Sequence, residues 1–341
     1  MLKRKEGNSP KRYLLLLLLM FGSFVGCQDK AYTDMTGEIE MTRLKVPNAD
    51  YQSVAWLNEQ TIAFISKDPD LDGNSDAAIG VFNIEMNKWE IVIPPMQLAD
   101  CFTRPSSYES LSRLPDGSLG YIFFCNKVDG GHSGTLYRWD IETAEVSVLQ
   151  EYPDFSPSKY TVSPDFTEII QENAIGVGLN NELYRFSLGG DGKQIFPDFQ
   201  RAAAPHWSPD GQSVIFAGTT NTPYSDPKSN HDIANLLLYP WTIYQMDADG
   251  SNVRELLTGL SSPILKWAPD GKRIAFSAEF SGKEGIWILD METKGISRVW
   301  RKGDLFDWSP DSKRIIVLDS EIYEQNALTF VAHPTILNID E

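Results

Sequence analysis

Helical periodicity, histidine and nucleotide-binding motifs are all scarce in this sequence of 341 residues. Beyond the first 26 residues, no segment repeats its apolar residues at the 3.6-residue period of an amphipathic helix, which argues against a helical protein. There is no phosphate loop and no dinucleotide fingerprint, so nothing marks a nucleotide site. Of the four histidines, His132, His206 and His231 could approach one face, but none has the paired spacing of zinc ligands.

Basic residues are in deficit as well. The chain has 30 Lys and Arg against 47 Asp and Glu, for a net charge of −17. A chain this acidic repels phosphate backbones and anionic lipid head groups, so we expect no nucleic acid among its partners. Hydrophobic residues make up 42% and aromatic residues 11% of the chain, which is enough for a sizeable core.

The first residues have the form of an export signal. A basic start precedes an apolar run at 13–21, which is short for a membrane-spanning helix. The end of this segment, F-V-G-C at 24–27, resembles the lipobox of bacterial lipoproteins, whose cysteine receives a diacylglycerol before the leader is cut. We therefore expect residues 1–26 to be a lipoprotein signal peptide, Cys27 to be lipidated and residues 27–37 to be a polar tether. A plain cleaved signal or an uncleaved anchor is the alternative.

A turn phrase recurs along the rest of the chain. A degenerate first copy at 54–64 keeps a tryptophan and the following strand, and five further copies contain Pro-Asp. The spacing of about 40 to 60 residues is that of propeller blades. Each unit has a short strand, the turn, an alternating apolar strand, a third strand after a variable loop and a fourth after another tight turn. This pattern predicts an all-β fold over residues 38–341, a six-bladed β-propeller of four-stranded antiparallel blades. The five Pro-Asp copies are Leu114-Pro-Asp-Gly117, Ser163-Pro-Asp-Phe166, Ser208-Pro-Asp-Gly211, Ala268-Pro-Asp-Gly271 and Ser309-Pro-Asp-Ser312.

The repeated phrase also suggests a family. W-S-P-D-G-Q-S-V-I-F-A at Trp207, with near copies at Trp267 and Trp308, resembles the PD40 (WD40-like) repeat of TolB-like propellers. The resemblance covers nearly all of residues 41–341 and implies the six-bladed fold and an exported binding protein. It does not include the separate N-terminal domain of TolB proteins, so their envelope role is not expected here. The chain has no G-x-S-x-G, so the hydrolase arrangement of prolyl-oligopeptidase-like propellers is absent.

Closing the ring requires the two chain ends to meet. Residues 38–46 read as a strand upstream of the first complete unit, while the last unit ends in a weak strand at 336–339. Our hypothesis is that residues 38–46 pair into the last blade.

The loop D-P-D-L-D-G-N-S-D at 68–76 has four carboxylates and a glycine that permits a sharp turn. Alternating carboxylates suit the oxygen ligands of Ca²⁺. The loop resembles the calcium loops of integrin-type propellers and departs from an EF-hand at Ile79. We expect a structural Ca²⁺ here, with a solvated polar loop as the alternative. The expected ligands are the side chains of Asp68, Asp70, Asp72 and Asp76 and the carbonyl of Asn74.

Two further features are expected on the face of the propeller that carries the loop at 68–76. In an oxidising compartment Cys101 and Cys125 would form a disulfide, with two buried thiols as the alternative. The insertion at 218–240 ends in an apolar segment, which indicates a ligand or partner surface, or else a plug over the central channel. Its candidate binding residues are Tyr224, His231, Leu237 and Tyr239, together with Trp241, which directly follows the insertion.

These features predict a monomeric, lipid-anchored protein in the periplasm or on the outer face of the cell envelope. Its function would be that of a non-enzymatic binding or scaffold module for an envelope protein, peptide or glycan, held to the membrane only through the anchor, with no catalytic residues. The alternative is a hydrolase or lyase of envelope polymers with carboxylates or a metal in the central channel. Convergent ionisable groups with strongly shifted pKa values at the channel mouth would favour the enzyme.

Titrating the soluble chain with Ca²⁺ should release heat and raise its melting temperature, with a Kd of about 10⁻⁴ to 10⁻³ M. Replacing Asp70 and Asp72 together by asparagine should remove both effects, because it removes two of the charged ligands. A titration with neither heat nor thermal shift would rule out the calcium loop.

Overall fold

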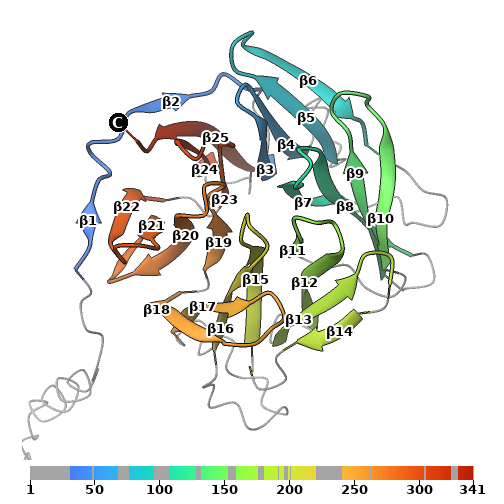
Figure 1. Cartoon of the computed structure of the whole chain (residues 1–341). Helices are drawn as coiled ribbons and strands as arrows, with labels where there is room; N and C mark the ends of the chain where they lie inside the picture. The colour runs from blue at the N-terminus through green and yellow to red at the C-terminus, as the bar shows by residue number, and fades with distance from the viewer. Residues whose placement is uncertain are drawn as a thin grey trace, which may run out of the picture. The chain divides into compact units, whose positions relative to one another are not determined.

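The structure is a computed structural model, shown in Figure 1. It divides into two compact units, Met1–Ala31 and Tyr32–Glu341, and only the second is described below. All regular elements among the described residues are β-strands, which confirms the all-β class. Within this part of the chain, no helix has the length and apolarity needed to cross a membrane. The signal peptide and Cys27 lie outside the described residues. These are 31–47, 50–67, 77–95, 107–127, 132–152, 159–175, 180–190, 192–195, 199, 201–219, 240–261, 263–302, 305–323 and 329–340.

Four separate sheets each contain four antiparallel strands. The first sheet consists of β3 (Asp50–Asn58), β4 (Thr61–Lys67), β5 (Ala77–Asn83) and β6 (Lys88–Ile93). The second consists of β7 (Ser107–Arg113), β8 (Leu119–Asn126), β9 (His132–Trp139) and β10 (Val146–Tyr152). The third consists of β11 (Lys159–Val162), β12 (Glu168–Ile175), β13 (Asn180–Ser187) and β14 (Gly192–Ile195). The fourth consists of β23 (Leu305–Trp308), β24 (Arg314–Tyr323), β25 (Thr329–Asn338) and β2 (Met41–Arg43).

The remaining strands form one nine-stranded sheet built from two such groups of four. In the strand pairing of the described residues, only the pair Leu260–Phe280 joins the two groups. The short strand β1 (Thr33–Asp34) adds to the outer edge of the second group in parallel. The first group is β15 (Arg201–Trp207), β16 (Ser213–Thr219), β17 (Trp241–Asp247) and β18 (Arg254–Leu260). The second group is β19 (Ile264–Trp267), β20 (Arg273–Phe280), β21 (Lys283–Asp290) and β22 (Ile296–Trp300).

The first strand of each group lies nearest the centre of the second unit in Figure 1. These inner strands contact one another in the order β3, β7, β11, β15, β19, β23, and β23 contacts β3 again. A closed circle of inner strands, each followed outward by three antiparallel partners, is the arrangement of a β-propeller. The predicted propeller architecture of four-stranded antiparallel sheets is therefore confirmed.

The repeated Pro-Asp turns join every inner strand except β3 to the next strand by local bonds. At 208–211, the amide of Gly211 donates to the Ser208 carbonyl at 2.9 Å, and the Ser208 hydroxyl donates to Asp210 at 2.6 Å. Asp210 also accepts the Gln212 amide at 3.0 Å. The same serine–aspartate bond recurs between Ser309 and Asp311 at 2.5 Å. These phrases build turns, as expected from their residue types.

The fourth turn position requires a left-handed backbone. Glycine supplies it at Gly211, with φ of 69°, whereas Ser312 adopts φ of 62° at the equivalent place. A side chain at positive φ is unfavourable, so a compensating contact is expected. The Ser312 hydroxyl accepts the Asp270 amide at 2.9 Å, and its carbonyl accepts a guanidinium hydrogen bond from Arg273 at 2.6 Å. The strained serine therefore ties the last sheet to the sheet before it.

The N-terminal strand completes the last sheet. In β2, Met41 pairs with Leu337 and Arg43 with Thr335. Leu44 follows, is 9% exposed and lies in a core cluster with Ile336 and residues of β3. Residues 41–43 therefore supply the outer strand of the sheet that contains the C-terminal strand, which confirms the hypothesis that the segment 38–46 pairs into the last blade.

A second set of contacts joins the last sheet to the first. The Trp56 amide in β3 donates to Asp307 Oδ2 in β23 at 2.7 Å. The Arg314 guanidinium lies 4.8 Å from the Trp56 ring centroid and donates to the Glu59 carbonyl at 3.1 Å. Trp56 is fully buried between these partners. The joint is thus made by residues from opposite ends of the chain.

Part of the segment expected to be a tether is docked on the propeller. Asp34 pairs with Arg298 in β22, and the Tyr32 ring packs edge-on against Trp287 at 4.9 Å. Hydrogen bonds from Thr36 and from Lys283 lower the pKa of Asp34 to about 2. Residues 32–36 are therefore held against the outer edge of β22.

Truncating the chain should show how much each N-terminal strand contributes to stability. A chain that begins at Glu38 loses β1 only, whereas one that begins at Pro47 also loses β2 and buried Leu44. We expect the second to melt about 5 °C or more below the first, because an outer strand and a core side chain are lost. The measurement is a thermal melt against the chain that begins at Tyr32. Equal melting temperatures for the two truncated chains would contradict this role of β2.

Candidate functional site

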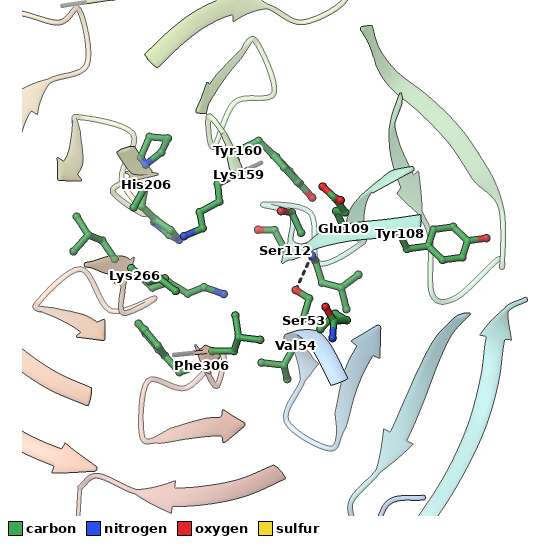
Figure 2. A pocket seen from close by; sticks show the side chains of 18 residues that line it. Ser53, Val54, Tyr108, Glu109, Ser112, Lys159, Tyr160, His206, Lys266 and Phe306 are labelled. Atoms are coloured by element: carbon green, nitrogen blue, oxygen red, sulfur yellow. Dashed lines mark hydrogen bonds between the residues drawn. The ribbon is translucent and has the colours of Figure 1, made fainter. Parts of the chain in front are cut away.

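A cavity of about 330 Å³ lies at the centre of the inner strands. It is lined by residues of all the inner strands, including the first residues of β11, β19 and β23, and we call it the loop-face cavity. Figure 2 shows its labelled side chains coming from different strands; Lys266 points toward the centre, whereas Tyr108 points away from it. Its polar lining includes Gln52, Ser53, Glu109, Ser110, Ser112, Lys159, His206 and Lys266.

A second cavity, of about 310 Å³, lies at the other ends of the inner strands. Its rim includes a proline from each of the five Pro-Asp turns, so we call it the turn-face cavity. Ser112, His206 and Lys266 line both cavities. These three side chains therefore stand at the neck between them. The rim prolines are Pro115, Pro164, Pro209, Pro269 and Pro310.

The repeat explains why these side chains face the centre. His206, Lys266 and Asp307 each come directly before the tryptophan of their unit. Because side chains alternate along a strand, a residue next to a buried tryptophan points to the opposite face. All three line the turn-face cavity, and Lys266 and Asp307 were not among the predicted site residues. Comparing the residue directly before the tryptophan in each repeat could have identified them from the sequence.

Lys266 and Asp307 form an ion pair inside the channel. Their Nζ and Oδ1 atoms are 2.7 Å apart, and the side chains are 19% and 13% exposed. The second carboxylate oxygen of Asp307 accepts the Trp56 amide described above. Since an ammonium group has three N–H donors, the pair leaves Lys266 with capacity for a ligand.

His206 lies beside this pair with a defined tautomer. Its Nδ1 is 3.0 Å from the Trp207 carbonyl oxygen. A carbonyl only accepts, so this contact needs a proton on Nδ1 and leaves Nε2 as an acceptor in the neutral ring. Burial, and then the charge of Lys266, lower the pKa of His206 to about 4. The imidazole is therefore neutral at pH 7.

A third cavity, of about 440 Å³, adjoins the loop-face cavity. The two share Lys159 and Ile264, and the third is also lined by Glu279 and Glu284 at the end of the β20–β21 hairpin. Lys159 thus lies between the loop-face cavity and two further carboxylates.

Several predicted site residues lie outside the described residues. They are the calcium loop at 68–76, Cys101, and Tyr224, His231, Leu237 and Tyr239 of the insertion. Cys125 is 6% exposed and is disulfide-bonded, while its pairing with Cys101 stays a prediction. In the part of the chain that is described, no group of three or more His, Cys, Asp or Glu side chains is placed to hold a metal ion.

Trp241 does not fit an exposed binding surface. It begins β17, is 3% exposed and belongs to a core cluster. The Arg201 guanidinium lies 4.8 Å from its ring centroid. A large aromatic ring at the start of a strand is drawn into the core, so Trp241 has a packing role.

Comparison with known proteins shows the fold of this chain. No family model matches its sequence. In the solved structure of TolB from Acinetobacter baumannii, 64% of that chain superposes on 83% of this one, with a TM-score of 0.57 and 17% identity. An oligogalacturonate lyase in complex with manganese covers 92% of this chain and is itself covered to 96%, with a TM-score of 0.55 and 14% identity. The fold is a TolB-like β-propeller. At these identities the likeness extends to the fold alone.

Two curated sequences match parts of this chain. The acylamino-acid-releasing enzyme of Rattus norvegicus is 21% identical over 202 residues, which is 54% of this chain and 26% of that enzyme. An uncharacterized protein, Atu1656, of Agrobacterium fabrum is 21% identical over 263 residues, or 74% of this chain and 77% of that protein. The chain therefore spans about a quarter of the rat enzyme.

The lowered pKa of His206 predicts a pH dependence of stability. Between pH 6.5 and 4 the unfolded chain binds more protons at this residue than the folded chain does, so the free energy of unfolding falls as the pH falls. The loss should reach about 3 kcal/mol by pH 4. Urea unfolding at pH 7, 5.5 and 4.5 should show this loss, and H206N should show less of it. NMR detection of a His206 ring that titrates near pH 6.5 would contradict the assignment.

Proposed function

We propose that this protein is an exported binding module that holds a ligand of the cell envelope in its loop-face cavity. The observation that carries the proposal is the convergence of polar side chains from separate inner strands on one cavity of about 330 Å³. Ligand sites are concave, preformed and furnished with a few convergent polar groups. The closed circle of inner strands brings such groups together from separate parts of the chain.

The proposal includes six blades. The two groups of four strands in the nine-stranded sheet follow the same outward order as the four separate sheets, and a single residue pair links them. Counting them as two blades matches the circle of inner strands. Each blade then contributes one inner strand to the wall of the channel.

The proposed location is the cell envelope, reached through the signal at 1–26 and held by a lipid on Cys27. Its support is the sequence of that segment. In this proposal the protein is a monomer with no membrane contact other than the lipid. A structural Ca²⁺ in the loop at 68–76 and binding through the insertion at 218–240 belong to the same proposal.

An enzyme is the second candidate, and one observation favours it. Neutral His206, with Nε2 as an acceptor, lies in the same cavity as Lys159 and Lys266. This nitrogen can accept a hydrogen bond from a substrate, although the lowered pKa makes the ring a weak base. A shifted pKa in a cleft is a mark of catalytic sites. This reading would make the protein a hydrolase or lyase of an envelope polymer.

Blocking the cavity mouth tests the proposed function. Gln52 is exposed and lines the loop-face cavity, so Gln52→Trp should obstruct the cavity with little effect on folding. Val253, which is 40% exposed on the β17–β18 turn, offers a matched control in Val253→Trp. Envelope peptides and glycans that bind the wild-type chain in an array screen should bind Gln52→Trp at least tenfold more weakly by calorimetry, with Val253→Trp unchanged.

Two outcomes would change this conclusion. Equal affinity of wild type and Gln52→Trp for every such ligand would remove the cavity as the binding site. Product formation during the titration, lost in His206→Asn, would replace the binding module by the enzyme.

A further inference from the structure

We propose that the loop-face cavity selects a small ligand with a carboxylate at one end and hydrogen-bond donors at the other. The geometry points to Lys159 and Lys266 as the side chains that meet the carboxylate. This inference rests on the proposed function of the cavity as a binding site and adds the chemical class of the ligand.

The cationic groups gather on one side of the cavity. Lys159 comes from β11 and Lys266 from β19, with His206 of β15 between these two strands. Figure 2 shows both lysine side chains reaching into the cavity from that side. Acidic residues outnumber basic ones by 47 to 30 in this chain, so two lysines in a concave site run against its overall charge. The positive charge on this one wall attracts a ligand group of the opposite sign.

The ion pair with Asp307 orients Lys266 and still leaves it N–H donors. The two carboxylate oxygens of Asp307 accept hydrogen bonds from Lys266 Nζ and from the Trp56 amide, each at 2.7 Å. The lysine head is therefore fixed in direction, and its remaining N–H donors can meet a ligand carboxylate. A charge-assisted hydrogen bond from a pre-oriented ammonium is stronger than one between neutral groups.

The opposite wall has a different chemistry. Glu109 and Ser112 of β7 and Ser53 of β3 lie there, across from the lysines (Figure 2). A carboxylate accepts hydrogen bonds and repels a second carboxylate, so this side favours hydroxyl or ammonium groups. The two walls together select a molecule with an acid at one end and donors at the other.

The volume limits the size of the ligand. About 330 Å³ is at the lower end of the range for small-molecule sites. The adjoining cavity of about 440 Å³ extends the space past Lys159 and Ile264. A sugar acid or a short peptide with a free terminal carboxylate has the required size and groups.

Four probes test whether the cavity prefers a carboxylate and whether that carboxylate belongs to a sugar or to a peptide. They are glucuronate and its neutral counterpart glucose, and the dipeptide Ala-Ala and its C-terminal amide. At low ionic strength, calorimetry should show at least one acid binding tenfold or more tightly than its neutral partner, and added salt should weaken that binding. A preference for glucuronate identifies a sugar acid, and a preference for Ala-Ala identifies a peptide terminus; either supports the proposal.

Variants assign the effect to the cavity. Lys159→Met should reduce the affinity for the preferred acid at least fivefold, while Lys159→Arg should retain most of it because the charge is kept. Lys88→Met is the matched control, because Lys88 lies on the outer strand β6 with its side chain 61% exposed. Melting temperatures equal to wild type would show that the variants are folded.

Equal binding of acids and neutral partners, or an unchanged acid affinity in Lys159→Met, would overturn the inference. So would the failure of both acids to bind. If Gln52→Trp still abolishes binding of an array ligand in that case, the cavity remains the binding site and only the ligand class is wrong. If Gln52→Trp also has no effect, the proposed function fails as well.

Discussion

The joint between the last sheet and the first is the contact on which the rest of this molecule depends. Sheets arranged in a circle are covered only by their neighbours, so an open joint would expose two apolar faces and a row of unpaired edge groups. Here the joint is made by the bond between the Trp56 amide and Asp307, by Arg314 on the Trp56 ring, and by β2 on the edge of β25. Each contact joins residues that are more than 250 positions apart or that come from opposite chain ends.

The same joint organises the cavity. Asp307 accepts the Trp56 amide with one oxygen and holds Lys266 with the other. One carboxylate, that of Asp307, therefore helps to close the ring and also orients Lys266 in the channel. A change that loosens the joint would also release Lys266, so stability and ligand binding are coupled at this residue. Neutral His206 stands beside the pair at the neck between the two cavities and adds an acceptor without adding charge.

Much of the architecture could be predicted from local patterns. The Pro-Asp turns, the alternating strands and the pairing of residues 41–43 into the last sheet agree with the sequence analysis. The cavity was not predicted, because His206, Lys266 and Asp307 each stand singly before a tryptophan and form no motif within one segment. Trp241 was assigned to a loop surface since it follows an apolar insertion, whereas burial of its indole on Arg201 decides its role.

By itself the sequence determined the turns, the strands and their repetition, because these depend on bonds within a few residues. Ser208, Asp210 and Gln212 make such a set, and their residue types are sufficient to indicate it. Only the tertiary structure decided which side chains share the channel. Lys266 and Asp307 are 41 residues apart, and Asp307 and Trp56 are 251 apart. Contacts over such separations exist only once the ring is closed, since closure places strands from distant units side by side.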